Sequence, residues 1–474
     1  MTSQEKVFLQ KSREKSADLD HRRKLNHALK QSDDAFEKGK LRFADLGTTK
    51  KIAKNIRWKA ISRLDHYLQE FERCFTQRGG KVIWAENATQ ARNAVKEICK
   101  AADARSIVKS KSMVTEEIHL NTFLEESGIE VVETDLGEYI QQLSGEAPYH
   151  IVAPSLHKSK EEVALLFSEK LGSASDLQPE QLTRVAREKL RDKFQTADIG
   201  ITGVNFLIAD IGGVAITENE GNARLTTSFP KIHIAITGIE KILPSVHDLG
   251  LFWPLLASHG SGQKITVYNS VLTGPRQDGE TDGPEEMYVI LLDNGRTDIL
   301  ADIKTRESLY CIRCGACLNG CPVYKNIGGH AYDTTYSGPI GSVISPFLKG
   351  MKENKHLSYA SSLCGKCTEV CPVGIHLHEL LLNNRRLAVE RHCNSLTEKV
   401  AFYGWKQAML NRGLLNVGGG RFKNLVLTQL FTGAWGKDRE LPVFAQKSFS
   451  QQWKDRHKSG FHLKNKKPEM IIEQ

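Results

Sequence analysis

The sequence lacks any run of about 20 apolar residues, the length that a membrane-spanning helix needs. The longest apolar-leaning stretch, residues 206–216, is interrupted by Asp210 and two glycines. The N-terminal segment MTSQEKVFLQKSREK carries charge throughout and has no apolar signal core. We therefore expect a cytoplasmic protein without a membrane span.

Several catalytic signatures are also absent. The sequence contains no G-x-x-x-x-G-K-[ST], no G-x-G-x-x-G after a strand, no G-x-S-x-G and no H-E-x-x-H. The sequence therefore shows no recognisable dinucleotide, ATP or hydrolase site. A chain of 474 residues with 40% hydrophobic composition is long enough for two or three domains with a sizeable core.

Seven cysteines carry the strongest functional signal. The segment CIRCGACLNGCPVY has the spacing C-x2-C-x2-C-x3-C-P of bacterial two-cluster ferredoxins, and a second run, SSLCGKCTEVCPVGI, follows it. In such proteins the last cysteine of each run binds the cluster of the other run. The prediction is two iron–sulfur clusters, expected to be 4Fe-4S, with the ligands Cys311, Cys314, Cys317 and Cys371 for the first and Cys321, Cys364 and Cys367 for the second.

The second run is one cysteine short, because Ser361 stands where a full repeat would have cysteine. Three explanations are open: Ser361 is a weak oxygen ligand, another group supplies the fourth bond, or this cluster has three irons. A zinc site is the alternative for C-x2-C pairs. Zinc needs neither the third cysteine nor a Cys-Pro closing both runs, so the pattern favours iron–sulfur clusters.

The chain divides into four predicted parts. Residues 1–79 are a helical arm or cap, residues 80–299 an α/β domain, residues 300–383 a mainly helical cluster domain, and residues 384–474 a basic helical segment with a tail. In the α/β part, short apolar runs alternate with helical patterns over 89–102 and 114–127, which predicts a parallel sheet. We also expect strands at HIVAP and KITVYN, and mixed pairing within residues 203–237.

Two polar loops of the α/β part follow predicted strands, where ligands of such sheets bind. Together they are expected to hold a small anionic or carbonyl ligand, with lysine and arginine supplying charge and glutamate acid–base function. A polar rim with a glycine turn at Gly221 is an equal alternative. The candidate residues are Lys109, Lys111, Glu116, Glu218, Asn222 and Arg224.

The net charge of +9 comes entirely from the C-terminal part. Residues 384–474 contain 17 Lys and Arg against 7 Asp and Glu. Such a segment suits an acidic protein partner, an anionic membrane or nucleic acid, whereas a solvated helical surface is the simpler interpretation. Nucleic-acid binding is not expected.

The order of these motifs resembles one family over essentially the full chain. KSKSMVTEE, ITENEGNARLTT, CIRCGACLNGCPVY, YSGPIGSVISP and ASSLCGKCTEVCPV are similar to the lactate utilization protein B family, the iron–sulfur component of the bacterial L-lactate oxidation system. The resemblance implies a LUD domain with the NagB/RpiA/CoA-transferase-like fold, and makes Ser361 a family feature. It also implies two companion subunits in a cytosolic system that oxidises L-lactate to pyruvate.

We therefore expect an electron-transfer subunit whose clusters accept single electrons and pass them to an acceptor that the sequence does not identify. The alternative is a CoA-transferase-like or small-acid-processing enzyme in which the clusters are accessory.

Overall fold

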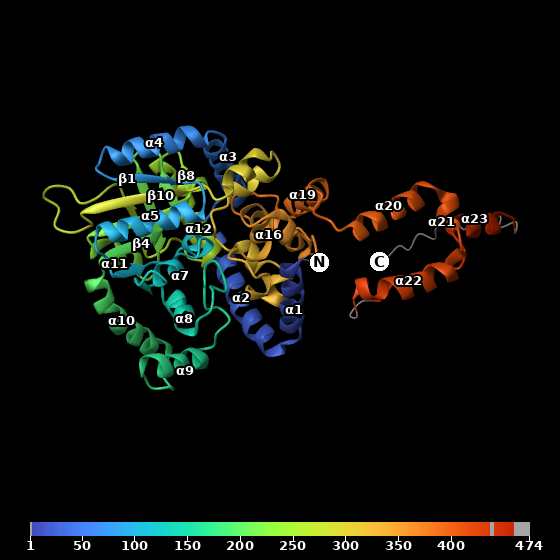
Figure 1. The fold of residues 1–474 in the computed structure, drawn as a ribbon, viewed down its shortest axis with the longest axis horizontal. Helices are drawn as coiled ribbons and strands as arrows, with labels where there is room; N and C mark the ends of the chain where they lie inside the picture. Colours follow the sequence, from blue (N-terminus) through green and yellow to red (C-terminus); the bar gives the residue numbers. More distant parts are fainter. Residues whose placement is uncertain (1, 437–439, 459–474) are drawn as a thin grey trace, which may run out of the picture. The chain divides into compact units, whose positions relative to one another are not determined.

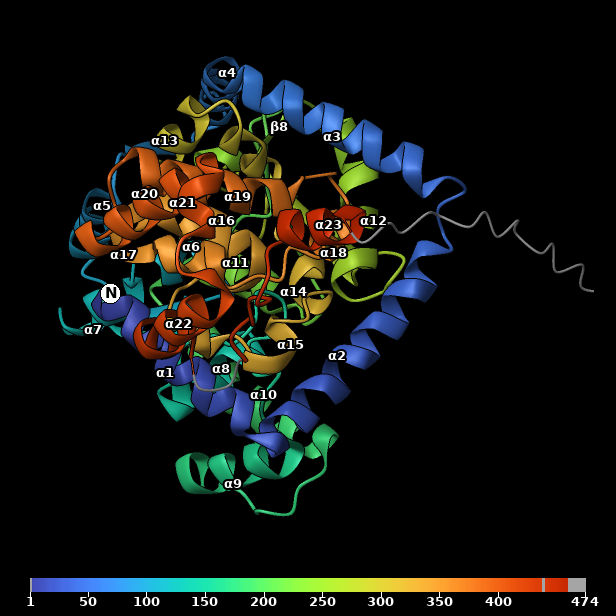
Figure 2. The same ribbon diagram turned by 90° about the vertical axis from the view of Figure 1, so that its right-hand side faces the viewer.

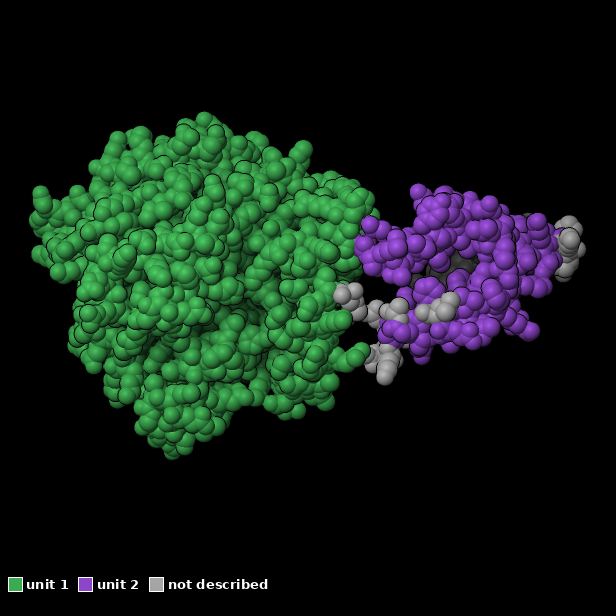
Figure 3. All heavy atoms as spheres, in the orientation of Figure 1, with its two compact units in different colours: residues 1–393 green, residues 394–474 purple. Residues whose placement is uncertain are grey.

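The computed structural model describes residues 2–436 and 440–458 of the chain. These residues form two compact units, 1–393 and 394–474, which are coloured separately in Figure 3. The basic tail predicted from the sequence, with its last lysines, lies in 459–474, outside the described residues. Over the described ranges, the structure contains no helix with the length and apolarity to span a membrane.

Four helices open the first unit. Their starts follow the sequence: Thr2, Asp18 and Asp45 each accept a hydrogen bond from a backbone N–H in the first turn of the helix that follows. Figure 2 shows α2 and α3 as long helices along the outside of the unit, and α12 packs against both. The helices are α1 (Ser3–Ala17), α2 (Leu19–Lys40), α3 (Leu46–Ser62) and α4 (Leu64–Thr76), with α12 at Leu249–Gly260.

A six-stranded parallel sheet is the centre of the α/β domain, in the order β1-β10-β7-β4-β2-β3 (Figure 1). This confirms the predicted α/β fold class with a parallel sheet. The strands are β1 (Lys81–Ala85), β2 (Ser106–Lys109), β3 (Glu130–Glu133), β4 (Ile199–Gly203), β7 (Ile232–Gly238) and β10 (Glu286–Leu292).

Side chains on the central strands alternate between the two faces of this sheet. Ile234 and Ile236 pack with the helices on one face, while Ala235 between them belongs to the core on the other face. The helices of the α/β domain are α5 (Ala88–Ala101), α6 (Met113–Glu117), α7 (Leu120–Glu125), α8 (Leu136–Ser144), α9 (Lys160–Leu171), α10 (Pro179–Thr196) and α11 (Asn222–Ser228).

The core on the second face continues without a break into the cluster domain. Ala235 and Val289 of the sheet share one hydrophobic cluster with Cys314, Cys317 and Cys371. The α/β part and the cysteine loops therefore fold as one unit, and their relative position is fixed by apolar packing.

Residues 206–218 leave the main sheet and contribute to a second, four-stranded sheet in the order β8-β5-β6-β9. The sequence predicted mixed pairing here, and the mixed pairing lies in this separate sheet, whereas β7 remains parallel in the first. Its strands are β5 (Phe206–Ile208), β6 (Gly213–Glu218), β8 (Ile242–Leu243) and β9 (Tyr268–Leu272).

Three local predictions differ from the structure. The helix expected over 114–127 is interrupted by His119, whose backbone has a φ of 51°. HIVAP is not a strand, because His150 Nδ1 accepts the N–H groups of Val152 and Ala153 and turns the chain. The strand expected at KITVYN begins later, at Tyr268, since Thr266 and Asn269 hydrogen-bond to each other in a turn.

Short helices build the cluster domain, as predicted. The spacer between the two cysteine runs folds into the core, and α16 buries nearly all of its length. The α-helices are α13 (Arg296–Ala301), α14 (Ala316–Asn319), α15 (Tyr324–Ile327), α16 (Gly338–Leu348), α17 (Met351–Asn354), α18 (Lys366–Val370) and α19 (Leu377–Glu390). The 3-10 helices of the chain are η1 (Ile239–Lys241), η2 (Val246–Asp248), η3 (Thr305–Tyr310), η4 (His330–Tyr332) and η5 (Lys355–Tyr359).

The second unit is helical over its described residues. None of the residues in α20 is buried, and its apolar side chains Phe402, Tyr403 and Trp405 are exposed. The helices are α20 (Leu396–Leu410), α21 (Arg412–Asn416), α22 (Gly419–Trp435) and α23 (Phe449–Lys458).

Candidate metal centre

The first cysteine loop leaves η3 at Cys311 and enters α14 at Ala316. Gly315 takes a φ of 78° at this entry, and a Cβ there would lie 3.0 Å from Val152 Cγ2. Only a glycine therefore reaches this backbone conformation without strain or crowding. The turn places Cys314 before the helix and Cys317 within it, both less than one-tenth exposed.

Four of the predicted ligands meet in one small apolar cavity. Its lining includes Cys311, Cys314 and Cys317 from the first loop and Cys371 from the end of the second, together with Ile340 of α16. The structure thus brings Cys371 to the first loop although it lies closer in sequence to the second. This is the arrangement that crossed ligation requires.

The other three predicted ligands form a second group. Cys321 lies within electrostatic range of Cys364, and Cys367 within range of both. Cys321 and Cys367 are buried, whereas Cys364 is exposed to solvent. The first group, in which only Cys311 is partly exposed, is thus the more enclosed, and the second reaches the surface at Cys364.

The two loops have matching local conformations. Arg313 and Leu363 both have positive φ, 61° and 55°, and each is followed two residues later by a glycine with φ near 80° that begins a short helix. In the first loop Arg313 donates its N–H to Cys311 Sγ at 3.4 Å. In the second loop Leu363 donates its N–H to the Oγ of Ser361 at 3.1 Å.

The donor set fits iron–sulfur clusters better than zinc. Among the described residues no three cysteine sulfurs lie within 4.8 Å of one another, whereas a tetrahedral zinc site holds its thiolates about 3.8 Å apart. Backbone N–H groups also face the sulfurs, including that of Ile375, 3.4 Å from Cys371 Sγ. Such N–H groups stabilise the negative charge of a bound cluster.

Burial keeps the thiols of Cys367 and Cys371 neutral in the absence of a metal. It raises the pKa of Cys367 and that of Cys371 to about 11. A cluster bound to these cysteines would supply reversible one-electron oxidation and reduction.

A buried arginine ties the first loop to the α/β domain. Arg57 of α3, 1% exposed, donates hydrogen bonds to the backbone carbonyls of Leu309, Tyr310, Glu240 and Ile242. These carbonyls belong to the segment before Cys311 and to the segment after β7. The guanidinium therefore fixes the start of the cysteine loop against the sheet.

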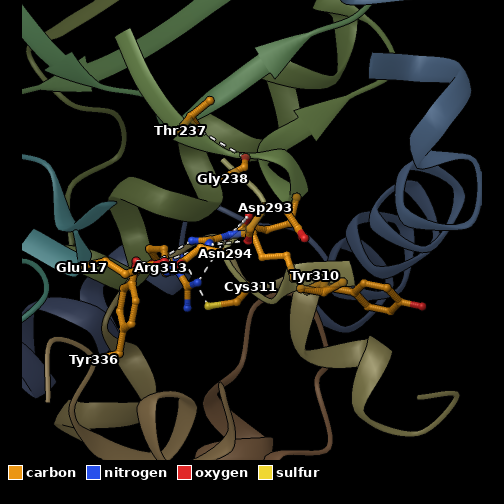
Figure 4. A network of polar contacts seen from close by, with 12 residues as sticks. Glu117, Thr237, Gly238, Asp293, Asn294, Tyr310, Cys311, Arg313 and Tyr336 are labelled. Atoms are coloured by element: carbon orange, nitrogen blue, oxygen red, sulfur yellow. Dashed lines mark hydrogen bonds and ion pairs between the residues drawn. The ribbon is translucent and has the colours of Figure 1, made fainter. Parts of the chain in front are cut away.

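A second buried network extends this connection (Figure 4). Glu240 accepts from Arg296 at 2.6 Å and pairs with Arg313 at 3.3 Å, and Arg296 binds Glu117 through both carboxylate oxygens. Burial alone would raise the pKa of Glu240, but Arg296 and Arg313 together lower it to about 2. Arg313, between two predicted cluster ligands, is thereby anchored to the α/β domain.

A cavity of about 290 Å³ adjoins the first cysteine loop on the α/β side. Of the predicted ligand-binding residues, Lys111, Glu218 and Asn222 line it. Glu220 of the same predicted loop also lines it, together with residues that the sequence did not single out, among them Asp135, Lys241, Arg313 and Tyr336. Lys241 lies past the end of β7. Because ligands of such sheets bind at strand ends, the same rule makes Lys241 a candidate ligand-binding residue.

The other three predicted residues lie away from this cavity. Lys109 is fully buried and pairs with Glu133 at 2.7 Å and with Glu116 at 3.4 Å. Arg224 is exposed, and its guanidinium lies over the ring of Tyr268. In this structure, Lys109 and Glu116 form a buried ionic cluster beneath the end of β2.

Two acidic residues of the cavity are held by the backbone. Glu218 accepts the N–H groups of Ala223 and Arg224, and Glu220 accepts that of Leu136. Burial, and after it the nearby Asp135, raise the pKa of Glu220 to about 7. Glu220 therefore presents to the cavity a carboxyl group that gains or loses a proton near neutral pH.

A parallel α/β domain joined through one core to paired cysteine loops defines a LUD protein with an appended iron–sulfur module. The family models agree: the LUD domain matches residues 68–292 and the 4Fe-4S dicluster domain matches residues 307–375. The predicted iron–sulfur cofactors are thereby confirmed.

Relatives match most of the chain. Lactate utilization protein B of Shouchella clausii is 43% identical over 422 residues, covering 87% of this chain and 89% of its own. The protein of the same name from Bacillus velezensis is 49% identical over 351 residues, or 74% of each chain. The chain belongs to the lactate utilization protein B family, which confirms the resemblance drawn from the sequence.

Proposed function

We propose that this chain is the iron–sulfur electron-transfer subunit of a cytoplasmic system that oxidises L-lactate to pyruvate and allows growth on lactate. The observation that carries the proposal is the pair of cysteine groups, one more enclosed and one reaching the surface. The name of the relatives, lactate utilization protein B, supports a role in lactate use, and the 4Fe-4S dicluster match supports the cofactor type.

Electron relay fits the division of labour between this chain and its companions. Lactate gives up two electrons together with protons, whereas each cluster accepts one electron. The chain has ligands for one-electron carriers and lacks a recognisable dinucleotide fingerprint. A companion subunit or its cofactor takes the electron pair, and the clusters of this chain receive the electrons singly.

The exposure of the cysteines suggests a route for the electrons. The first group, with Cys314, Cys317 and Cys371, is buried next to the cavity of the α/β domain. The second group reaches solvent at Cys364. In the proposed route the enclosed cluster and the surface cluster are successive carriers, and a redox partner docks at the loop of Cys364.

The second unit is the proposed contact for a companion subunit. Its described helices are basic and carry exposed aromatic side chains, among them Phe402, Tyr403 and Trp405 of α20. Aromatic residues within a charged surface are typical of protein interfaces. Truncation after residue 393 is expected to abolish co-purification of the companion subunits and to retain both clusters; full assembly of the truncated chain would contradict this.

A second candidate function is a CoA-transferase-like or small-acid-processing enzyme with accessory clusters. The cavity of about 290 Å³, with Glu218 and Glu220 in its wall, favours it. Turnover of a small acid by a variant without clusters would support this function over electron relay.

Growth distinguishes these functions. Cells in which Cys314→Ser replaces the native chain are expected to lose growth on L-lactate and to keep growth on pyruvate. Cys393→Ser, a cysteine outside both runs, is the matched control and should grow on both. Normal growth of the Cys314→Ser cells on lactate, with no other lactate oxidase present, would refute the relay.

A further inference from the structure

The cavity of about 290 Å³ connects the α/β domain with the first cysteine loop. Its walls come from the ends of β2, β4 and β6, from α12, from η1 and from the start of the cluster domain. Arg313 lines both this cavity and the small cavity of the first cysteine group. Ile151 also lines both cavities, so the two cavities share part of their walls.

Lys241 is a buried lysine in this wall, and its burial, with the nearby Arg313, lowers its pKa to about 7. It is 5% exposed, and within the described ranges its Nζ forms no hydrogen bond or ion pair, although Glu240 attracts it electrostatically. Burying an ammonium group without a partner costs free energy. An anionic group bound in the cavity would supply the missing partner.

Arg313 adds a second cationic group beside Lys241. Glu240 holds it at 3.3 Å and the ring of Tyr336 lies 4.5 Å away, so its guanidinium is fixed in place. Its Nη1 is buried and has no partner among the described residues. Two fixed cations with free donors suit a carboxylate, which accepts from both at once.

Acidic residues in the cavity wall determine which other groups a ligand can carry. Asp135, Glu218 and Glu220 line the same cavity and accept hydrogen bonds. They favour a ligand with a hydroxyl or similar donor and oppose one with several negative charges, such as phosphate.

We propose that this cavity binds a small hydroxycarboxylic acid, with its carboxylate on Lys241 and Arg313 and its hydroxyl toward the acidic wall. The inference rests on the proposed function for its choice of probe, L-lactate. It extends that function by placing a substrate-class site within this chain, next to the first cysteine group.

Calorimetric titration of the full-length, cluster-loaded protein under anaerobic conditions tests the proposal. L-lactate is the probe, with propionate lacking the hydroxyl and inorganic phosphate as comparisons. L-lactate should bind more tightly than either. Lys241→Met should raise the Kd for L-lactate at least about tenfold, and Lys170→Met, an exposed lysine of α9, should leave it unchanged.

The melting temperature distinguishes the loss of a ligand-binding group from a folding defect. Because Lys241→Met removes a buried amino group that forms no hydrogen bond or ion pair and keeps the aliphatic chain, its melting temperature should equal or exceed that of the native chain. Loss of binding with a lower melting temperature would indicate a structural lysine and overturn the proposal.

Two further outcomes would overturn it. One is equal Kd values for L-lactate in the native chain and Lys241→Met, or phosphate as the tightest ligand. The other is a shifted potential of the first cluster in ligand-free Lys241→Met with unchanged binding, which would assign Lys241 to the cluster. Because these measurements need no companion subunit, they stand apart from the growth test of electron relay.

Discussion

Ser361 holds in the second cysteine loop the position that Cys311 holds in the first. Each side chain accepts the backbone N–H of the residue two positions later, at 3.1 Å for Ser361 Oγ and 3.4 Å for Cys311 Sγ. The residues around them repeat the same positive φ values. The second loop therefore keeps the geometry of a ligand position and presents a hydroxyl there.

This relationship predicts that the second cluster is the more labile of the two. In the predicted ligand set three thiolates hold it instead of four, and a hydroxyl is a poorer ligand for iron than a thiolate. Ser361→Cys should slow its loss of iron in air, measured by EPR and iron content over time. Ser362→Cys, which adds a thiol one position away, should not, and equal stability of both clusters in all three proteins would contradict the idea.

Crossed ligation predicts which cluster each cysteine supports. Cys371→Ser should damage the cluster of Cys311, Cys314 and Cys317, because Cys371 lines their cavity. Cys364→Ser should damage only the other cluster. Mössbauer or EPR spectra of the two variants distinguish the clusters, and a Cys371→Ser protein that has lost only the second cluster would refute the assignment.

Arg57 is expected to be a major source of stability for the first unit. Arg57→Met leaves four backbone carbonyls without their buried donor, which should cost about 3–5 kcal/mol of unfolding free energy. Lys59→Met, an exposed position of the same helix, is the control and should change little. Urea denaturation measures both, and equal midpoints would show that Arg57 does not hold the loop.

Glu138 of α8, which lies outside the cysteine loops in sequence, gives a pH-dependent prediction. Burial and the neighbouring Glu133 raise its pKa well above the usual range. A carboxyl group with a raised pKa in the folded state contributes stability that is fully present below about pH 4 and is lost as the pH rises through that pKa. The melting temperature of the native chain should therefore fall over this range.

Glu138→Gln removes this titration and keeps the shape of the side chain. Its melting temperature should match that of the native chain near pH 4.5 and exceed it by several degrees at pH 8. Glu188→Gln, at an exposed site of α10, serves as the control. Parallel pH profiles for the native chain and Glu138→Gln would contradict the expectation.

The sequence predicted the parts of the fold that local patterns determine. Alternating apolar runs indicated the parallel sheet, and cysteine spacing indicated the two groups of thiols. The second sheet was not distinguished from the first, because alternation along a strand does not say which strand it pairs with. HIVAP has the composition of a strand, and only the contact of His150 with its own backbone turns it.

The sequence predicted part of the candidate pocket, because local patterns locate the ends of strands. Lys111, Glu218 and Asn222 follow strands, so the position of strand ends located them. Lys109 also ends a strand, but its side chain points into a buried cluster with Glu133, and sequence does not give that direction. Arg313 was hidden within the cysteine run, where only tertiary packing brings it to the cavity.

The most direct test of electron relay is EPR of the cluster-loaded chain mixed anaerobically with its two companion subunits, recorded before and after L-lactate is added. Lactate should convert the clusters to their reduced state while pyruvate forms, and neither change should occur with Cys314→Ser in the mixture. Pyruvate formation at the native rate while the clusters stay oxidised would contradict electron relay.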